Sequence, residues 1–288
     1  MKRIILYILL AFLGHDGLAQ DATVAYKVEN YDFLYSPNLK IKTNCEMADI
    51  IFVKGSGDKV IIKCTYSAKH VDKLVASKEL GRHNIRVKKT LNEIFISNYF
   101  TVQKGETEPK AKLNVKFEIS IPQQVHLETD NNFGSTLVEN LSIRGTIQQD
   151  YGKLELKKVI ANVDIQGKLC DMQILQSKGM VRCSNKSGDI TVEQFSGKEL
   201  QIKNTNAQLK LMSIQTEVAL DLDLSNCSLT CSNMSYNQRS LDISSYKEPI
   251  KTASSLNISI KNNYYTILTT KNAPLLKIKA TYSKINLN

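Results

Sequence analysis

The chain has 288 residues, a hydrophobic fraction of 42% and a formal net charge of +10. This composition excludes an intrinsically disordered chain and supplies enough apolar residues for a sizeable core. The length suits one elongated domain or two ordinary ones.

The first 20 residues have the pattern of a signal peptide. Two basic residues, Lys2 and Arg3, precede ten consecutive apolar residues, and small residues precede a cleavage site after Ala19 or Gln20. The apolar run is too short to span about 30 Å of hydrocarbon, which argues against a membrane anchor. We therefore expect an exported bacterial protein with no transmembrane segment in the mature chain. Its destination is the periplasm, the outer membrane, the cell surface or the medium.

The mature chain remains basic. Without Lys2, Arg3 and Asp16 it carries 36 Lys and Arg against 27 Asp and Glu, a net charge of +9. This balance favours acidic partners such as anionic polysaccharide, lipid headgroups or nucleic acid. The basic residues are spread along the chain, which also fits an ordinary lysine-rich surface. We therefore expect no specific nucleic-acid partner.

An apolar-polar-apolar unit recurs through the second half of the chain. Eight copies begin at Gly145, Val163, Val181, Leu200, Leu220, Leu241, Ile258 and Leu276. A second unit follows each copy at a fixed offset, beginning at Leu154, Met172, Ile190, Leu209, Leu229, Ile250, Ile267 and Ile285. Successive repeats are 17 to 21 residues apart, and 29 of the 32 expected inward positions are apolar. Leu127 to Val138 form a weaker, earlier copy.

Each repeat predicts two short strands with alternating inward and outward side chains. A helical repeat would need apolar spacings of three and four over ten or more residues. Antiparallel hairpins would not need a constant period, whereas stacked coils do, because each residue lies about 4.8 Å above its counterpart. We predict an all-β fold in which residues 127–288 form a single-stranded parallel β-helix. This β-solenoid should be right-handed, with about 18–20 residues per coil.

The corner before each second strand carries small residues, as a tight turn requires. They are Gly152, Cys170, Gly188, Ala207, Cys227 and Ser283. The preceding position holds Tyr151, Ser187, Asn206, Asn226, Tyr264 and Tyr282, which could stack as a ladder. Glu248 and Tyr265 break the corner rule, so the sixth and seventh repeats should be distorted there.

Residues 21–126 lack the period but still indicate β structure. The sequence Gly55-Ser56-Gly57-Asp58 between two apolar segments predicts a hairpin, and residues 84–90 with 93–97 predict a second. A short helix is compatible with residues 71–80. We predict that this region is either an irregular β-rich cap over the first strand edge, because bare edges aggregate, or a set of irregular early coils. The last strand, residues 282–287, has no such cap, so its edge could pair with another chain.

The sequence shows no recognisable enzyme chemistry. His70, His83 and His126 stand alone, without the spacing of a zinc motif. Asp171 and Asp189 lie one coil apart and point outward. A glycosidase pair would need about 5–9 Å between carboxyl groups inside a cleft, and nothing predicts a cleft. We predict no catalytic, cofactor-binding or metal-binding residue and no cofactor.

The six cysteines divide by position. Cys183 and Cys231 fill inward columns and should be buried hydrophobes. Two more occupy corners and are too far apart to bridge: they are Cys170 and Cys227. Cys45 and Cys64 flank the first predicted hairpin and could form a disulfide across it.

Residues 117–197 resemble two bacterial families: the adhesin-like domain of unknown function and the head domain of putative auto-transporter adhesins. The resemblance is carried by an alternating strand that ends at Pro122 and by the segments Tyr151-Gly-Lys-Leu-Glu-Leu156 and Ser187-Gly-Asp-Ile-Thr-Val192. The resemblance extends beyond these segments over most of the mature chain and implies an envelope β-helix without established catalytic residues.

The leading functional hypothesis is a non-enzymatic envelope or surface protein that acts as an adhesin-like binding or scaffold module. Its outward ladders of Lys, Gln, Ser, Thr and Asn would suit cell-surface glycans or other envelope components. Two alternatives come from other classes. One is a polysaccharide-active β-helix enzyme, which would need a groove of clustered Asp, Lys and Arg. The other is a structural protein that self-associates through the C-terminal strand edge.

Overall fold

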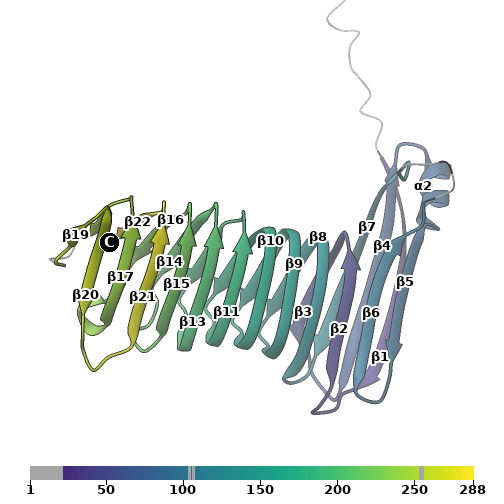
Figure 1. The fold of residues 1–288 in the computed structure, drawn as a ribbon. Coiled ribbons are helices and arrows are strands. Elements are labelled where there is room, and N and C mark those ends of the chain that lie inside the picture. The colour runs from purple at the N-terminus through teal and green to yellow at the C-terminus, as the bar shows by residue number, and fades with distance from the viewer. Residues whose placement is uncertain (1–21, 103–104, 106–107, 253–255) are drawn as a thin grey trace, which may run out of the picture.

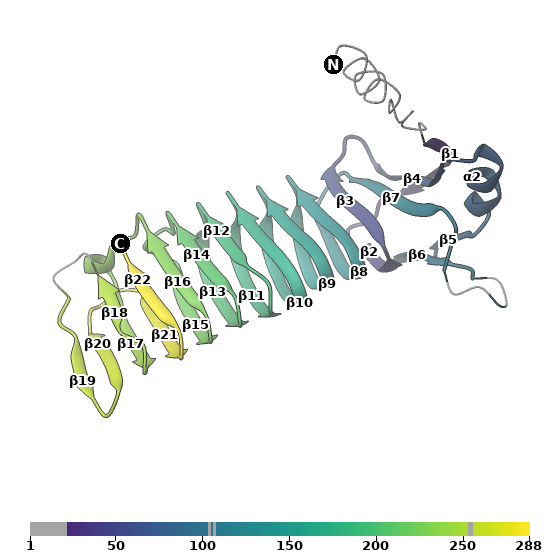
Figure 2. The same cartoon turned by 90° about the horizontal axis from the view of Figure 1, so that it is seen from above.

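The computed structural model describes residues 22–102, 105, 108–252 and 256–288; the predicted signal peptide lies outside them. These residues are almost entirely β, with one short α-helix, α2 (Lys73–Leu80), and a 3-10 helix, η1 (Tyr236–Gln238). The strands stack side by side into an elongated body (Figures 1 and 2). No helix within the described part of the chain is long and apolar enough to cross a membrane.

Two ladders of hydrogen-bonded strands run along this body, and most of their pairings are parallel. The first ladder consists, in spatial order, of β5 (His83–Lys89), β6 (Glu93–Phe100), β2 (Lys40–Glu46), β8 (Val125–Glu139), β9 (Ser142–Lys157), β10 (Ile160–Leu175), β11 (Lys178–Lys186), β13 (Ser196–Thr205), β15 (Ala219–Ser225), β21 (Leu275–Thr281), β17 (Ser240–Tyr246), β20 (Tyr264–Thr269) and β19 (Ser259–Lys261).

The second ladder begins with β1 (Thr23–Leu34), β4 (Lys59–His70), β7 (Lys112–Ile121) and β3 (Ala48–Lys54). It continues through the second halves of β8, β9 and β10, which are long enough to take part in both ladders. It ends with β12 (Ile190–Glu193), β14 (Gln208–Met212), β16 (Ser228–Ser232), β22 (Lys284–Leu287) and β18 (Ile250–Thr252).

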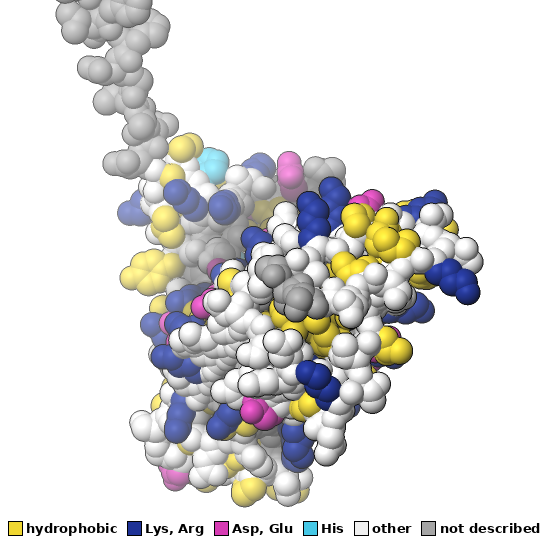
Figure 3. Space-filling model, turned by 90° about the vertical axis from the view of Figure 1, so that its left-hand side faces the viewer, with side chains coloured by type: hydrophobic (Ala, Val, Ile, Leu, Met, Phe, Trp, Pro, Cys, Tyr) yellow, Lys and Arg dark blue, Asp and Glu magenta, His cyan; other side chains and the backbone are white. Residues whose placement is uncertain are grey.

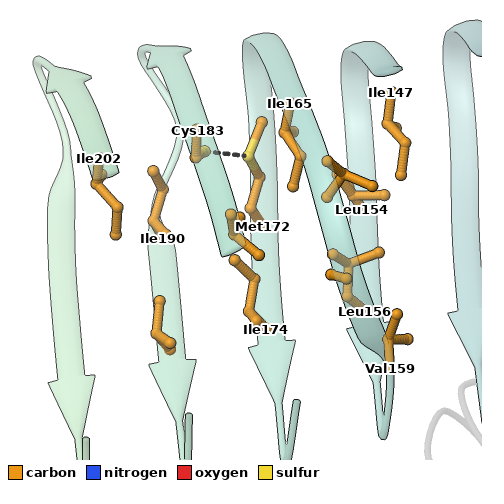
Figure 4. Close-up of a cluster of buried hydrophobic side chains, with 14 of the residues drawn as sticks. Ile147, Leu154, Leu156, Val159, Ile165, Met172, Ile174, Cys183, Ile190 and Ile202 are labelled. Atoms are coloured by element: carbon orange, nitrogen blue, oxygen red, sulfur yellow. Dashed lines mark hydrogen bonds between the residues drawn. The ribbon is translucent and has the colours of Figure 1, made fainter. Parts of the chain in front are cut away.

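The strand register follows the period of the sequence. Val163 lies opposite Gly145 on one side and Val181 on the other. Met172 lies opposite Leu154 and Ile190 in the second ladder. The inward columns therefore stack on themselves between the ladders and form one continuous hydrophobic core, part of which is drawn in Figure 4. The core accounts for most of the stability, because apolar burial is the main force favouring folding.

The predicted corner ladder is present in part. Five of the six predicted residues adopt left-handed backbone conformations, with φ between 50° and 59° at Tyr151, Ser187, Asn206, Asn226 and Tyr282. The sixth, Tyr264, lies in β20 instead. Phe133, Leu169 and Lys247 adopt the same conformation at the corners of other repeats, with φ between 53° and 69°. The Phe133 and Tyr151 rings stack with centroids 4.5 Å apart. The Asn226 amide donates to the Asn206 side-chain oxygen at 3.1 Å.

Buried amides satisfy the carbonyl groups that these corners turn inward. Asn185 is 3% exposed, and its Nδ2 donates to the carbonyls of Cys170 and Gly188 at 2.9 and 2.8 Å. Asn131, Gln149 and Asn204 are equally buried, and each donates to at least one corner carbonyl. An unpaired buried carbonyl would be costly, so these polar side chains inside the core have a structural purpose.

The C-terminal strands correct the predicted order of repeats. Strand β21 lies between β15 and β17, and β22 lies between β16 and β18. The chain therefore passes over one position, forms β17 and β18, and returns to fill the gap with its last residues. Ile285 is 1% exposed. The C-terminal strand is thus an interior strand, and the prediction that its edge is open for self-association is wrong.

Charge explains why this order is favoured. Lys277 of β21 lies opposite Asp221 of β15 and Asp242 of β17, and Lys279 lies opposite Asp223. If the strands stacked in the order of the sequence, β17 would lie next to β15, and Asp221 would face Asp242. Like charges directly opposite each other destabilise a strand pair, whereas opposite charges stabilise it.

The segment that begins at Ile258 is also not a coil. Strands β19 and β20 form an antiparallel hairpin that pairs with β17. Its turn residues, Asn262 and Asn263, both have positive φ, as the favoured two-residue hairpin turn requires. Ile260 and Leu268, expected inward and outward respectively, are 67% and 75% exposed. This end of the body carries visible hydrophobic side chains (Figure 3).

The first predicted hairpin of the N-terminal region is wrong, because β7 lies between β3 and β4. The turn at residues 55–58 carries the chain across the end of β7, where the Gly55 amide donates to the Ile121 carbonyl at 2.8 Å. Cys45 and Cys64 are therefore not hairpin partners, and all six cysteines are buried free thiols. The second hairpin is confirmed as β5 and β6, and the short helix as α2.

The charge alternation at the C-terminal insertion generates a stability prediction. Replacing Lys277 with Glu places three carboxylates on adjacent strands and should lower the free energy of unfolding by about 1 kcal/mol. Urea denaturation at low salt measures the change, and high salt should reduce it. Lys284→Glu is the matched control, because Lys284 lies opposite Ser228. An equal loss in both variants would contradict the charge explanation.

The N-terminal region generates a pH prediction from His83. Its Nε2 lies 3.0 Å from the Ser67 carbonyl, and its ring packs against Tyr66 and Phe100. Burial lowers the pKa of His83 below its ordinary value. The neutral form is therefore favoured by folding, and stability should be complete above about pH 6.5 and fall as the pH drops toward the lowered pKa.

Urea midpoints between pH 8 and pH 5 measure this loss. His83→Phe should flatten the pH dependence, whereas His126→Gln, at an exposed position, should leave it unchanged. A pH dependence that persists in His83→Phe would show that other groups cause it.

Candidate functional site

The outward side of the first ladder is a regular polar surface, which we call the ladder face. In-register pairing brings one outward residue of each repeat into a row: Lys42, Glu128, Thr146, Asp164, Arg182, Gln201 and Asp221. A parallel row holds Asn44, Asp130, Gln148, Gln166, Ser184, Lys203 and Asp223. Neighbours within each row are about 4.8 Å apart, because that is the spacing of adjacent strands.

Two depressions lie along the ladder face. The larger has a volume of about 450 Å³ and extends from Thr146 to Asp223. The smaller, of about 290 Å³, extends from Lys42 to Gln166. They share Thr146, Asp164 and Gln166, so together they form one shallow open groove across the stacked strands. Such a groove can hold an extended molecule along the axis of the stack.

Ion pairs link most of the charged residues of this groove. Arg182 lies 3.6 Å from Asp164 and 3.4 Å from Glu199, and Lys203 lies 4.0 Å from Asp223. At the other end, the Lys40 ammonium lies 2.6 Å from Glu128 and holds the pKa of that carboxyl below its ordinary range. These pairs are solvent-exposed and contribute little to stability. Their charges remain available to a polar ligand.

Asp130 differs from the other acidic residues of the groove. Its Oδ1 is buried and accepts no hydrogen bond from the described residues. Burial raises the pKa of Asp130, and the carboxylate of Asp150 raises it further. An unsatisfied buried acceptor is costly, so the ionised carboxylate of Asp130 is destabilised in the folded protein.

Sequence reasoning did not single out Asp130. It stands at an ordinary outward position after Thr129, and no motif marks it. Its burial and its proximity to Asp150 depend on how the two corners stack, which the pattern of apolar residues does not predict.

The residues searched for enzyme chemistry have structural roles. Asp171 accepts the backbone N–H of Asp189 at 3.0 Å, and Asp189 accepts that of Gln208 at 2.8 Å. These carboxylates are exposed on the second ladder, outside the groove, where they bind backbone groups of the following repeat. His126 lies 3.9 Å from Glu128 at the end of the groove, and His70 accepts the Asp72 N–H at 2.9 Å. The described ranges contain no group of three or more His, Cys, Asp or Glu side chains that could hold a metal ion.

Three solved structures illustrate what the fold is similar to. A putative adhesin from Bacteroides fragilis is 15% identical, with coverage of 72% of this chain and 97% of that chain and a TM-score of 0.35. A putative cell adhesion protein from Clostridium sporogenes is 10% identical, with coverages of 91% and 99% and a TM-score of 0.27. A putative lipid binding protein from Parabacteroides distasonis is 9% identical, with coverages of 71% and 92% and a TM-score of 0.28. No family model and no curated protein matches the sequence.

The raised pKa of Asp130 generates a stability prediction. Because its pKa is raised on folding, the ionised carboxylate costs stability above that pKa, and the cost disappears below the ordinary pKa of about 4. Asp130→Asn should therefore raise the unfolding midpoint at pH 7 and lose this advantage toward pH 4. Asp164→Asn, which removes an exposed partner of Arg182, should not stabilise the protein. An equal or lower midpoint for Asp130→Asn at pH 7 would contradict this account.

Proposed function

We propose that this chain is an exported, non-enzymatic, adhesin-like protein of the bacterial envelope that binds a repetitive glycan in the groove of the ladder face. Residues 127–288, apart from the β19–β20 hairpin, form a single-stranded parallel β-helix in this proposal, and residues 21–126 form its β-rich cap. Residues 1–20 act as the signal peptide. The resemblance of residues 117–197 to adhesin-like families supports the assignment.

The groove is the observation on which the proposal depends. It extends across stacked strands and presents hydrogen-bonding side chains at nearly constant intervals, such as Thr146, Gln166, Ser184 and Gln201. A polysaccharide offers hydroxyl groups at regular intervals along an extended chain, so it can contact several repeats at once. Many weak contacts of this kind combine into useful affinity.

A polysaccharide-active enzyme is the second candidate, because the larger depression contains the clustered Asp, Lys and Arg side chains that such an enzyme would need. Asp164, Asp221 and Asp223 line it together with Arg182 and Lys203. The side chains of Asp164 and Asp223 are 56% and 55% exposed and lie within 4.0 Å of a cation. An acid or base for sugar cleavage normally needs a less hydrated setting that shifts its pKa. We therefore favour binding over catalysis.

Glycan binding is tested with the labelled mature chain on an array of bacterial and host polysaccharides. We expect binding to a repetitive glycan, with affinity that increases with glycan length. Replacing both Gln166 and Gln201 with Ala should weaken binding about thirtyfold, since each lost hydrogen bond is worth about 1 kcal/mol and about 1.4 kcal/mol corresponds to tenfold. The control replaces Gln173 and Lys210 with Ala on the outward side of the second ladder.

Equal weakening in the control would place the binding site elsewhere on the molecule. Shortening of the glycan during incubation, lost when Asp221 and Asp223 are replaced with Asn, would favour the enzyme instead.

Location is tested by treating intact cells with a protease. Cleavage of this protein without lysis supports a surface adhesin. Protection until lysis would contradict surface exposure and support a periplasmic scaffold or binding role.

A further inference from the structure

Strand β1 leaves a long backbone edge without a partner. Its 12 residues, Thr23–Leu34, pair with β4 on one side, and no other described strand pairs with them. An unpaired edge offers a row of N–H and C=O groups that can hydrogen-bond another extended chain. The opposite end of the body has only short free strands, β18 and β19, of three residues each.

The two N-terminal edges are built differently. Strand β5, at the edge of the first ladder, has seven residues and carries Arg86, Lys88 and Lys89, and such cations discourage edge pairing. Strand β1 contains no proline. Four strands, β1, β4, β7 and β3, precede β8 in the second ladder, whereas only β5, β6 and β2 precede it in the first.

The outward side of β1 is apolar in the first half of the strand. Val24, Tyr26 and Val28 are 50%, 68% and 40% exposed. They follow one another at alternate positions and therefore share one face of the strand. On the inner side, Lys27 lies 2.8 Å from Glu29, which also accepts hydrogen bonds from Tyr31 and Tyr66.

The charges of β1 are complementary to those of a second, antiparallel β1. With Val28 opposite Val28 of the second copy, Lys27 faces the second copy's Glu29, and Glu29 faces its Lys27. Tyr26 then faces Asn30, and Val24 faces Asp32. Any other register that keeps the same side chains on each face of the sheet is shifted by at least two residues. A shift of two residues would place Lys27 opposite the second copy's Lys27, or Glu29 opposite the second copy's Glu29. Like charges directly opposite destabilise a strand pair, so one register is favoured over its neighbours.

We propose that two copies of this chain associate through their β1 edges into a symmetric dimer with Val28 at the two-fold axis. The pairing extends the second ladder across both copies without altering either fold. It buries Val28 against Val28 of the second copy, and it packs Tyr26 beside Asn30 of that copy. A closed two-fold interface uses the same patch on both copies and leaves no further β1 edge open.

The proposal is tested by sedimentation velocity on the mature chain over a range of concentrations. The wild-type chain should form dimers. Val28→Lys places two like charges at the axis and should give monomers. Thr65→Lys is the matched control, because Thr65 pairs with Val28 on β4 but lies one strand away from the edge, so this variant should still dimerise. Circular dichroism checks that each variant is folded.

Charge reversal and cross-linking test the register itself. Lys27→Glu should give monomers, and adding Glu29→Lys should restore the dimer. Mild oxidation of Val28→Cys should produce a covalent dimer, because directly opposed residues are close enough for a disulfide. A wild-type chain that stays monomeric up to its solubility limit would overturn the proposal. So would a dimer that Val28→Lys leaves intact.

Discussion

The structure depends on in-register stacking of the repeats. Each inward side chain lies against its counterpart in the repeats before and after it, so the apolar columns stay continuous only if the register is kept. A slip of one residue would turn every inward side chain outward. This constraint explains why the repeats have a nearly constant length. It also explains why the differences in length between repeats lie outside the segment that joins the two strands of a repeat.

Stacking also determines which irregularities are tolerated. The corners need left-handed backbone conformations, and the buried amides of Asn185 and its equivalents bind the carbonyls that these corners expose. Gly167 occupies the same column as Asn185. A Cβ at Gly167 would approach Met172 Cε and Asn185 Oδ1 to 2.1 and 2.7 Å, so glycine leaves room for both neighbours. Local exceptions in the sequence are therefore accommodated by the repeats next to them.

The same regularity produces the candidate site. Outward residues form rows because inward residues form columns, and the groove runs along these rows. The ladder face is nearly flat, which favours contact with a long ligand over enclosure of a small one. Its charged residues are largely paired with one another, which suits recognition of a polar, weakly charged chain.

The sequence predicted most of the inward columns and most of the corner residues, because each depends on local pattern. It did not predict that β21 lies between β15 and β17, since the apolar pattern is the same in either order. The difference lies in the outward charges of Asp221, Lys277 and Asp242, which the pattern of inward apolar residues does not contain. The hairpin turn at Asn262-Asn263 was likewise not predicted, because the apolar residues around it have the same spacing as those of a coil. Asp130 became visible only when the stacked corners placed Asp150 beside it.

The out-of-order insertion of the last repeat is the strongest consequence of this account, and disulfide trapping tests it directly. Thr230 lies opposite Asn286, and Asn286 lies opposite Lys251. Adjacent strands are about 4.8 Å apart, within the range of a disulfide, whereas strands two places apart are not. We predict that a chain with Thr230→Cys and Asn286→Cys forms the cross-link on mild oxidation, and that a chain with Thr230→Cys and Lys251→Cys does not. Efficient cross-linking of the second chain and none of the first would show that the repeats stack in sequence order and would contradict the account.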